Sequence, residues 1–174
     1  MFIREVKSDE LETILPRLGA ILLACVEEGA SVGFVEPFGQ KESEAFFEQS
    51  VFPDILAKKR VLLVAEIDAE IAGTVQLQIG MLPNQTHRGE VGKLLVDPAY
   101  RRRGIGRALM LALEFCAEKA EKSLLTLDTR TGDMAEPLYT ALGFQTAGVI
   151  PNYCRAPEAG STVLDSTTYM FKQI

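Results

Sequence analysis

The chain has 174 residues, a length that favours a single domain spanning residues 1–174. Hydrophobic residues make up 47% of it and charged residues 24%, a balance that supplies a buried core and excludes an intrinsically disordered protein. The formal net charge of −6 disfavours nucleic acid and anionic membranes as partners, and no apolar run approaches the length of a membrane span.

The first half of the chain predicts one strand, two helices and a hairpin. Residues 2–6 alternate apolar and charged side chains, as a half-buried strand does. Residues 8–25 carry a helical apolar face, which Pro16 should kink or divide. A loop interrupted by glycine and proline follows at 27–38. The other elements expected here are a helix at 42–58 and hairpin strands at 61–67 and 71–82.

The second half alternates strands and helices. The expected elements are, in order, a strand at 91–96, a helix at 105–119, a strand at 124–128, a helix at 135–142, a strand at 144–150, a long loop at 151–165 and a strand at 166–172. The whole order predicts a mixed α/β fold, with about seven strands in one sheet and about four helices distributed over both faces.

The stretch from Val91 to Lys119 is the most informative, because a short apolar strand leads through a basic turn into a helix. The first amides of a helix lack partners and its dipole favours an anion there. Gly104 and Gly106 leave this backbone open to a phosphate group. A dinucleotide-binding fingerprint is incomplete and a P-loop is absent. The alternative is a solvated basic turn that caps an ordinary helix.

Two motifs in the sequence resemble those of the GNAT superfamily of acetyl-CoA-dependent N-acetyltransferases. The first is Leu94-x-Val96-x-Pro98 followed by Arg101-Arg102-Arg103-Gly104-Ile105-Gly106, and the second runs from Ala135 to Phe144 as AEPLYTALGF. Within the superfamily the chain looks most like the tabtoxin-resistance type. The stretches that carry this closer likeness are Gly29–Phe34, Leu127–Thr129 and Pro151-x-Tyr153-Cys154.

The resemblance implies a twisted, mostly antiparallel sheet, acetyl-CoA as the co-substrate and no metal. It also implies that strand 91–96 separates from its neighbour and that the pantetheine arm fills the gap. The cofactor-binding residues expected are the backbone of Leu94, Leu95 and Val96 and the turn residues Arg101, Arg102, Arg103, Gly104, Ile105, Gly106 and Arg107. Many members have an Asn that contacts the cofactor where this chain has Gly132, so that contact should come from backbone or be missing.

Acetyl transfer from a thioester to an amine requires a proton acceptor, a donor to the carbonyl oxygen and an acid for the thiolate. Tyr139 is the expected acid, since the family motif has a tyrosine there and a phenol with a pKa near ~10 is protonated at neutral pH. Glu90 is the expected base and Asp128 the expected anchor for the ammonium, and the reverse assignment is open. His87 is a weaker base candidate. The alternative for Tyr139 is a core tyrosine that packs on its helix, and the alternative for each carboxylate is a surface group or a loop cap.

The loop at 27–38 exposes Val32, Phe34 and Phe38, so it would form a wall of the acceptor pocket or fold back onto the core. The acceptor-binding residues expected from the resemblance are Ser31, Val32 and Phe34, together with Asp128. The expected function is direct acetylation of a small-molecule amine, with an amino-acid-like, antibiotic-like or toxin-like acceptor. A non-catalytic acyl-CoA-binding module and a protein or peptide N-acetyltransferase are the alternatives. Three cysteines without metal-ligand spacing and the absence of a signal-peptide pattern favour the cytoplasm. Monomer and homodimer both remain open.

Overall fold

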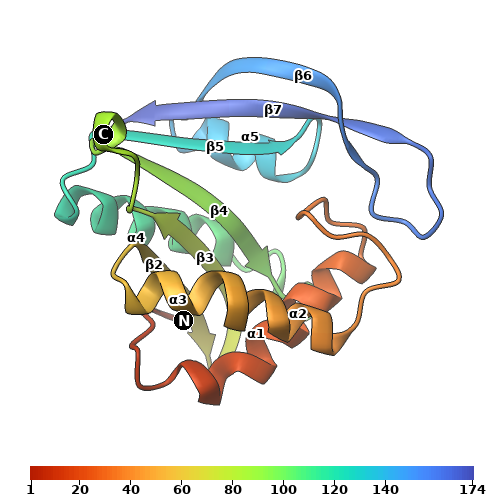
Figure 1. Cartoon of the computed structure of the whole chain (residues 1–174), viewed down its shortest axis with the longest axis horizontal. Helices are drawn as coiled ribbons and strands as arrows, with labels where there is room; N and C mark the ends of the chain where they lie inside the picture. The colour runs from red at the N-terminus through yellow and green to blue at the C-terminus, as the bar shows by residue number, and fades with distance from the viewer.

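The computed structural model describes residues 1–174 and contains one seven-stranded sheet in the order β1-β2-β3-β4-β5-β7-β6 (Figure 1). The strands are β1 (Phe2–Glu5), β2 (Arg60–Ile67), β3 (Glu70–Gln78), β4 (Arg88–Val96), β5 (Leu124–Arg130), β6 (Gln145–Arg155) and β7 (Leu164–Gln173). All neighbours are antiparallel except β4 and β5, which are parallel. The predicted mixed, mostly antiparallel sheet is therefore confirmed.

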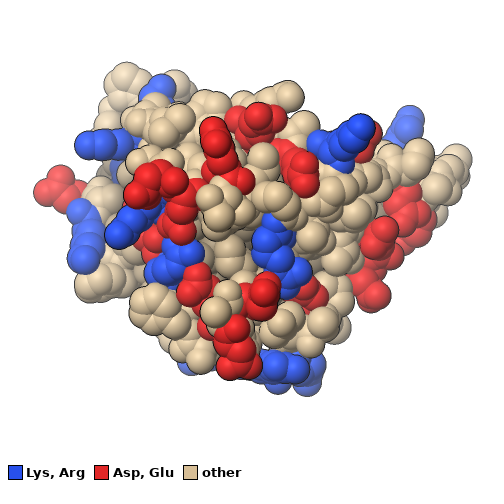
Figure 2. All heavy atoms as spheres, turned by 90° about the horizontal axis from the view of Figure 1, so that it is seen from below, with Lys and Arg blue, Asp and Glu red and all other residues tan.

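Helices cover both faces of the sheet and create two apolar cores. The helices are α1 (Leu11–Glu27), α2 (Gln40–Phe46), α3 (Phe52–Leu56), α4 (Ile105–Lys119) and α5 (Ala135–Ala141). α1 and the α2–α3 segment bury one face of β2 and β3, α4 buries the opposite face of these strands, and α5 packs on β5. None of these helices combines the length and the apolar character needed to cross a bilayer. On the face in Figure 2, acidic and basic side chains are interspersed.

The N-terminal helices differ from the sequence prediction in two ways. α1 is a single helix that contains Pro16, so of the two outcomes expected at this proline, a kink or a division, the division does not occur. Its buried apolar face, which includes Leu18 and Leu22, holds the segment together although proline removes one backbone bond. The single helix expected at 42–58 is instead α2, a π-helical segment (Phe47–Val51) and α3. Pro53 has no amide to continue the helical ladder, so the chain changes its winding just before it.

β6 is longer than predicted. The sequence suggested a strand at 144–150 and a loop at 151–165, whereas β6 continues through Pro151 to Arg155 and pairs with β7 from Leu164. The register shifts between Ile150 and Cys154, and Asn152 there has φ +54°. Proline is tolerated because β6 is an edge strand, where the missing amide faces no neighbouring strand. The consequence is a long hairpin that reaches past the end of β5 (Figure 1).

β4 and β5 stay together over a very short distance. They pair only at Arg88–Leu124, Gly89–Leu125 and Glu90–Thr126, and beyond these positions the two strands diverge (Figure 1). On its other side β4 remains paired with β3 as far as Val96, through a bulge in which Lys93 and Leu94 oppose the single residue Val75. The sheet therefore has a wedge-shaped opening between its two halves, as the family resemblance implied.

Candidate active site

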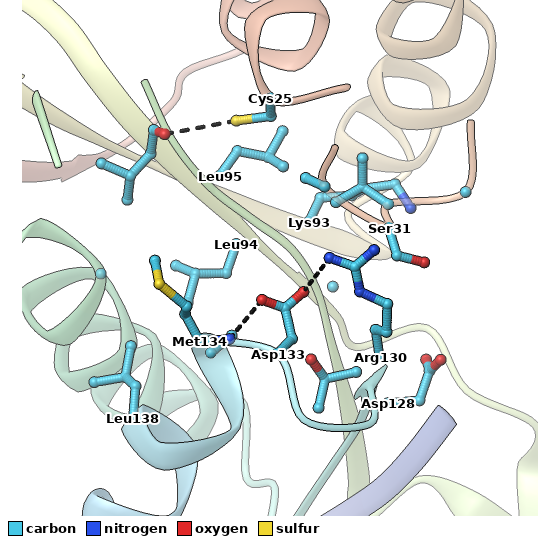
Figure 3. A pocket seen from close by; sticks show the side chains of 18 of the residues that line it. Cys25, Ser31, Lys93, Leu94, Leu95, Asp128, Arg130, Asp133, Met134 and Leu138 are labelled. Atoms are coloured by element: carbon cyan, nitrogen blue, oxygen red, sulfur yellow. Dashed lines mark hydrogen bonds and ion pairs between the residues drawn. The ribbon is translucent and has the colours of Figure 1, made fainter. Parts of the chain in front are cut away.

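A cavity of about 600 Å³ occupies this opening, a volume typical of ligand-binding pockets (Figure 3). Its walls come from β4, β5, the turn before α4, α5, the loop that follows α1, and β6. Residues toward α4 and α5 are Leu94, Val96, Gly106, Leu138 and Tyr139. Residues toward α1, the loop after it and the β6 side are Ser31, Val32, Lys93, Leu95, Arg101, Asp128, Tyr153 and Cys154. The cavity thus joins an anion-binding turn to a polar end that carries both signs of charge.

The turn before α4 offers a row of free amide donors. No amide of residues 102–107 donates a hydrogen bond within the protein, and the first bond of this helix runs from the Ala108 amide to the Gly104 carbonyl at 3.0 Å. Arg102 and Gly104 both have positive φ, +64° and +77°. Consecutive unpaired amides in this conformation form a concave anion-binding surface, reinforced by the helix dipole. The free amides make this turn a candidate binding surface for a pyrophosphate.

The two glycines of the turn have different roles. Gly104 is in the left-handed region, where a side chain is strained, and a Cβ there would touch no other part of the protein. Gly106 lines the cavity, and a Cβ on it would approach Leu138 of α5 to 3.3 Å. Gly106 therefore lets α4 and α5 come close together across the open end of the wedge.

The arginines of the turn are arranged around its rim. Arg101 lines the cavity, with its Nε 3.4 Å from the Val96 carbonyl oxygen. Arg102, Arg103 and Arg107 are exposed, and the Arg103 guanidinium lies 5.3 Å from the centre of the Tyr100 ring. Ile105 points into the core, so only its backbone is available to a ligand. These charges surround the free amides and would add to their attraction for phosphate.

Tyr139 reaches the cavity from α5. It is 7% exposed, packs against Phe144 with ring centres 5.9 Å apart, and makes no hydrogen bond through its hydroxyl within the protein. Burial, with a contribution from the Asp133 and Asp128 charges, raises the pKa of Tyr139 well above its ordinary value of 10. The phenol is therefore protonated at neutral pH and has a free hydrogen to donate into the cavity.

The two predicted carboxylates occupy different positions. Asp128 lines the cavity from β5, and its Oδ2 accepts a hydrogen bond of 3.1 Å from the Thr167 hydroxyl. Glu90 lies at the narrow end of the wedge and is not part of the cavity wall. Its carboxylate is 3.0 Å from the Arg88 guanidinium, and its side chain is 54% exposed. Arg88 also donates to Thr126 Oγ1 at 2.7 Å. Because alternate residues of a strand share a face, Glu90 on β4 and Asp128 on β5 lie on the same face of the sheet as this pair.

The loop between α1 and α2 closes one side of the cavity. Ser31 and Val32 line it, whereas Phe34 packs beneath the loop with Phe38 and Phe46, at ring-centre distances of 4.6 and 5.2 Å. Part of the loop thus faces the cavity, and part folds onto the core. The loop also touches the β6–β7 hairpin through the Ser31–Cys154 contact of 3.6 Å.

Lys93 is the main site residue that sequence reasoning missed. It occupies the bulge of β4 at φ +51° and lines the cavity. Burial lowers the pKa of its ammonium, the Asp128 charge opposes this effect, and the Arg60 charge adds to it. The signal was a lone lysine inside an apolar strand, where the alternation of side chains breaks. Cys25 and Tyr153 also line the cavity without having been predicted there.

Gly132 takes no part in the cavity wall. It turns the chain at φ +78° just before α5, and its amide donates to Glu136 Oε2 at 2.8 Å. The amide is therefore already bonded and is not free for a ligand.

Solved structures of acetyltransferases share the architecture of this chain. The ribosomal-protein-alanine N-acetyltransferase of Brucella melitensis superposes with a TM-score of 0.78 at 20% identity, covering 100% of both chains. The protein yncA of Salmonella typhimurium, solved with its cofactor acetyl-CoA, superposes with a TM-score of 0.76 at 20% identity, covering 99% of this chain and 93% of that one. These likenesses establish the fold.

The chain belongs to the acetyltransferase (GNAT) family, whose sequence model matches residues 18–144. The N-alpha-acetyltransferase RimI of Mycobacterium tuberculosis is 41% identical over 71 residues, which are 40% of this chain and 43% of that protein. The matched stretches span only 20% to 43% of the curated relatives. The family resemblance is thereby confirmed, while nothing in these relatives bears specifically on the tabtoxin-resistance type.

Proposed function

We propose that the protein transfers the acetyl group of acetyl-CoA directly to the amine of a small molecule bound in the wedge between β4 and β5. The observation that carries the proposal is the continuity of the cavity. Free amides at the start of α4 stand at one end, and charged side chains from β4 and β5 stand at the other. Such a cavity can hold a long phosphorylated donor and bring its reactive end to a polar acceptor, which supplies proximity and orientation.

The residues present fit acetyl-CoA, which would supply the thioester. The amides of residues 102–107 would hold the pyrophosphate, and the rim arginines Arg102, Arg103 and Arg107 would neutralise phosphate charge. The backbone of Leu94–Val96, left without a partner on the β5 side, would track the pantetheine amides and donate to the carbonyl oxygen. No side chain is required to form a covalent intermediate.

In the proposed reaction a C–N bond forms as the C–S bond breaks. The amine gives up a proton and the thiolate receives one. Tyr139 would donate to the thiolate, because its hydroxyl is protonated, free and in the cavity. Asp128 would anchor the ammonium form of the acceptor. Glu90, exposed at the narrow end, would accept the proton through water and pass it to solvent.

A small acceptor is favoured over a protein terminus by the closed polar end. The α1–α2 loop bridges to the β6–β7 hairpin through the Glu36 amide, which donates to the Pro157 carbonyl at 2.8 Å, and through the Ser31–Cys154 contact. An extended peptide would need an open groove there. The relatives named for N-terminal or ribosomal-protein acetylation keep a protein acceptor as the second candidate. A toxin-like acceptor of the tabtoxin type remains the finer hypothesis, supported by Ser31, Asp128 and Tyr153 in the wall.

A panel of acceptors tests the proposal. Purified protein and acetyl-CoA are mixed with amino acids, polyamines, aminoglycosides and a peptide with a free N-terminus, while free thiol is followed optically and products by mass spectrometry. We expect saturable turnover of at least one small amine. Turnover of the peptide alone would shift the assignment to a protein acceptor. Calorimetric binding of acetyl-CoA without turnover of any amine would indicate a non-catalytic binding module.

A further inference from the structure

Lys93 has no partner within the protein for its charge. Its ammonium makes no hydrogen bond or ion pair, and its defined neighbours are the rings of Phe46 and Phe34, whose centres lie 5.4 and 5.9 Å away. Aromatic faces favour a cation but accept no conventional hydrogen bond, so the three ammonium donors remain unused. A charge placed on the wall of a cavity in this state is available to a ligand.

The backbone holds Lys93 in this position at a cost. Its φ of +51° is uncommon for a residue other than glycine, and it results from the bulge at which Lys93 and Leu94 oppose Val75. The loop above leaves room for the side chain, because Nζ is 3.6 Å from the point that a Cβ on Gly33 would occupy. The lysine is therefore directed under the α1–α2 loop to the polar end of the cavity (Figure 3).

Asp128 lies on the facing wall with one carboxylate oxygen free of hydrogen bonds. Thr167 donates to Oδ2 at 3.1 Å, and the other oxygen makes no hydrogen bond within the protein. Lys93 and Asp128 both line the cavity, yet they form no ion pair with each other (Figure 3). Two opposite charges held apart across a cavity are complementary to a ligand that carries both charges.

We propose that the acceptor is a zwitterion whose carboxylate binds Lys93 while its amine binds on the Asp128 side. The inference rests on the proposed function and names the substrate class of the same site. Lys93 directly precedes Leu94, whose amide would hold the carbonyl under attack, so a carboxylate bound by Lys93 would lie close to the reacting centre. An α-amino acid or a close analogue satisfies this spacing, whereas polyamines and aminoglycosides present a second cation to Lys93.

The experiment compares matched acceptor pairs. Each L-α-amino acid and its carboxamide share the side chain and the amine but differ in the negative charge. The measured quantity is the ratio of kcat/KM for the acid to kcat/KM for the carboxamide, in wild type, Lys93→Met and Lys93→Arg. Intrinsic differences in amine basicity cancel when the ratios of two proteins are compared. Lys41→Met is the matched control, because Lys41 is exposed on α2 and outside the cavity.

We expect Lys93→Met to lower the acid-to-carboxamide ratio by about ten- to a hundredfold, the usual effect of losing a hydrogen bond to a charged group. Lys93→Arg should restore part of the ratio, and Lys41→Met should leave it at the wild-type value. Equal ratios in wild type and Lys93→Met overturn the inference while leaving acetyl transfer intact. An equal loss of kcat on acid and carboxamide also overturns it, since it would make Lys93 a proton-transfer group. Absence of turnover with every amine, while acetyl-CoA binds, removes the proposed function itself.

Discussion

Glu90 and Thr126 are the last residues at which β4 and β5 face each other in register, and Asp128, two residues further along β5, already lines the open cavity. The separation follows from the bulge at Lys93 and Leu94, because β4 keeps its bonds to β3 and bends with that half of the sheet. The carboxylates therefore lie at and just beyond the point where the sheet opens, which is where the proposed acceptor would meet a donor bound in the gap.

Gly104→Val should weaken acetyl-CoA binding by at least about tenfold. Gly104 has φ +77°, and a β-branched residue there would strain or reshape the turn whose amides are proposed to hold phosphate. Isothermal titration calorimetry measures the affinity. Gly160→Val is the matched control, because Gly160 has φ +71°, lies outside the cavity, and has equally open space around its Cβ position. Equal affinity in the two variants would contradict the phosphate assignment.

Tyr139→Phe should lower kcat by about 10²–10⁴ while acetyl-CoA affinity stays near that of wild type. The substitution removes one hydroxyl and keeps the packing against Phe144, so a purely structural tyrosine would show no such loss. Steady-state kinetics and calorimetry on the same preparations separate the two quantities. Tyr100→Phe serves as control, since Tyr100 lies outside the cavity. An unchanged kcat would mean that solvent protonates the thiolate.

Tyr139 also predicts how stability depends on alkaline pH. Its pKa is raised in the folded state, so below pH ~10 the phenol is protonated in both states. Above pH ~10 the unfolded chain loses the proton and the folded chain keeps it, and the free energy of unfolding falls by up to ~1.4 kcal/mol per pH unit from this group. Urea titrations between about pH 9 and about pH 11 should show that the free energy of unfolding falls less steeply with pH in Tyr139→Phe than in wild type. Parallel declines in the two proteins would contradict a buried, protonated phenol.

Local chemistry explains what the sequence made predictable. The strand, the glycine turn and α4 are contiguous, so free amides at residues 102–107 follow from neighbouring residues alone. Tyr139 was recognisable because its motif is a continuous stretch that forms α5. In both cases the chemistry depends on the conformation of a short segment, which its own residues determine.

The remaining features depend on pairing between distant segments. The bulge that directs Lys93 into the cavity exists only in the register of β3 against β4, and the opening beyond Glu90 depends on where β4 leaves β5. The extension of β6 through Pro151 was missed because proline usually ends a strand, and only the sheet order shows that β6 is an edge strand. These are long-range properties that a pattern along the chain does not encode.

Glu90→Gln and Asp128→Asn should affect different kinetic parameters. Asp128 lines the cavity and has a free carboxylate oxygen, so its amide variant should mainly raise the KM for the amine by weakening the hold on the ammonium. Glu90 is exposed beside Arg88 and can exchange a proton with solvent, so its amide variant should mainly lower kcat.

Raising the pH distinguishes the two roles, because it supplies the amine already deprotonated. The kcat of Glu90→Gln should recover in part as the pH rises, whereas the acceptor KM of Asp128→Asn should remain raised. The test is to measure kcat and KM for both variants and wild type from about pH 6 to about pH 10. Exchange of the two phenotypes would assign the base to Asp128. If neither substitution changes either parameter, the proton leaves through water alone and both carboxylates are peripheral to the reaction.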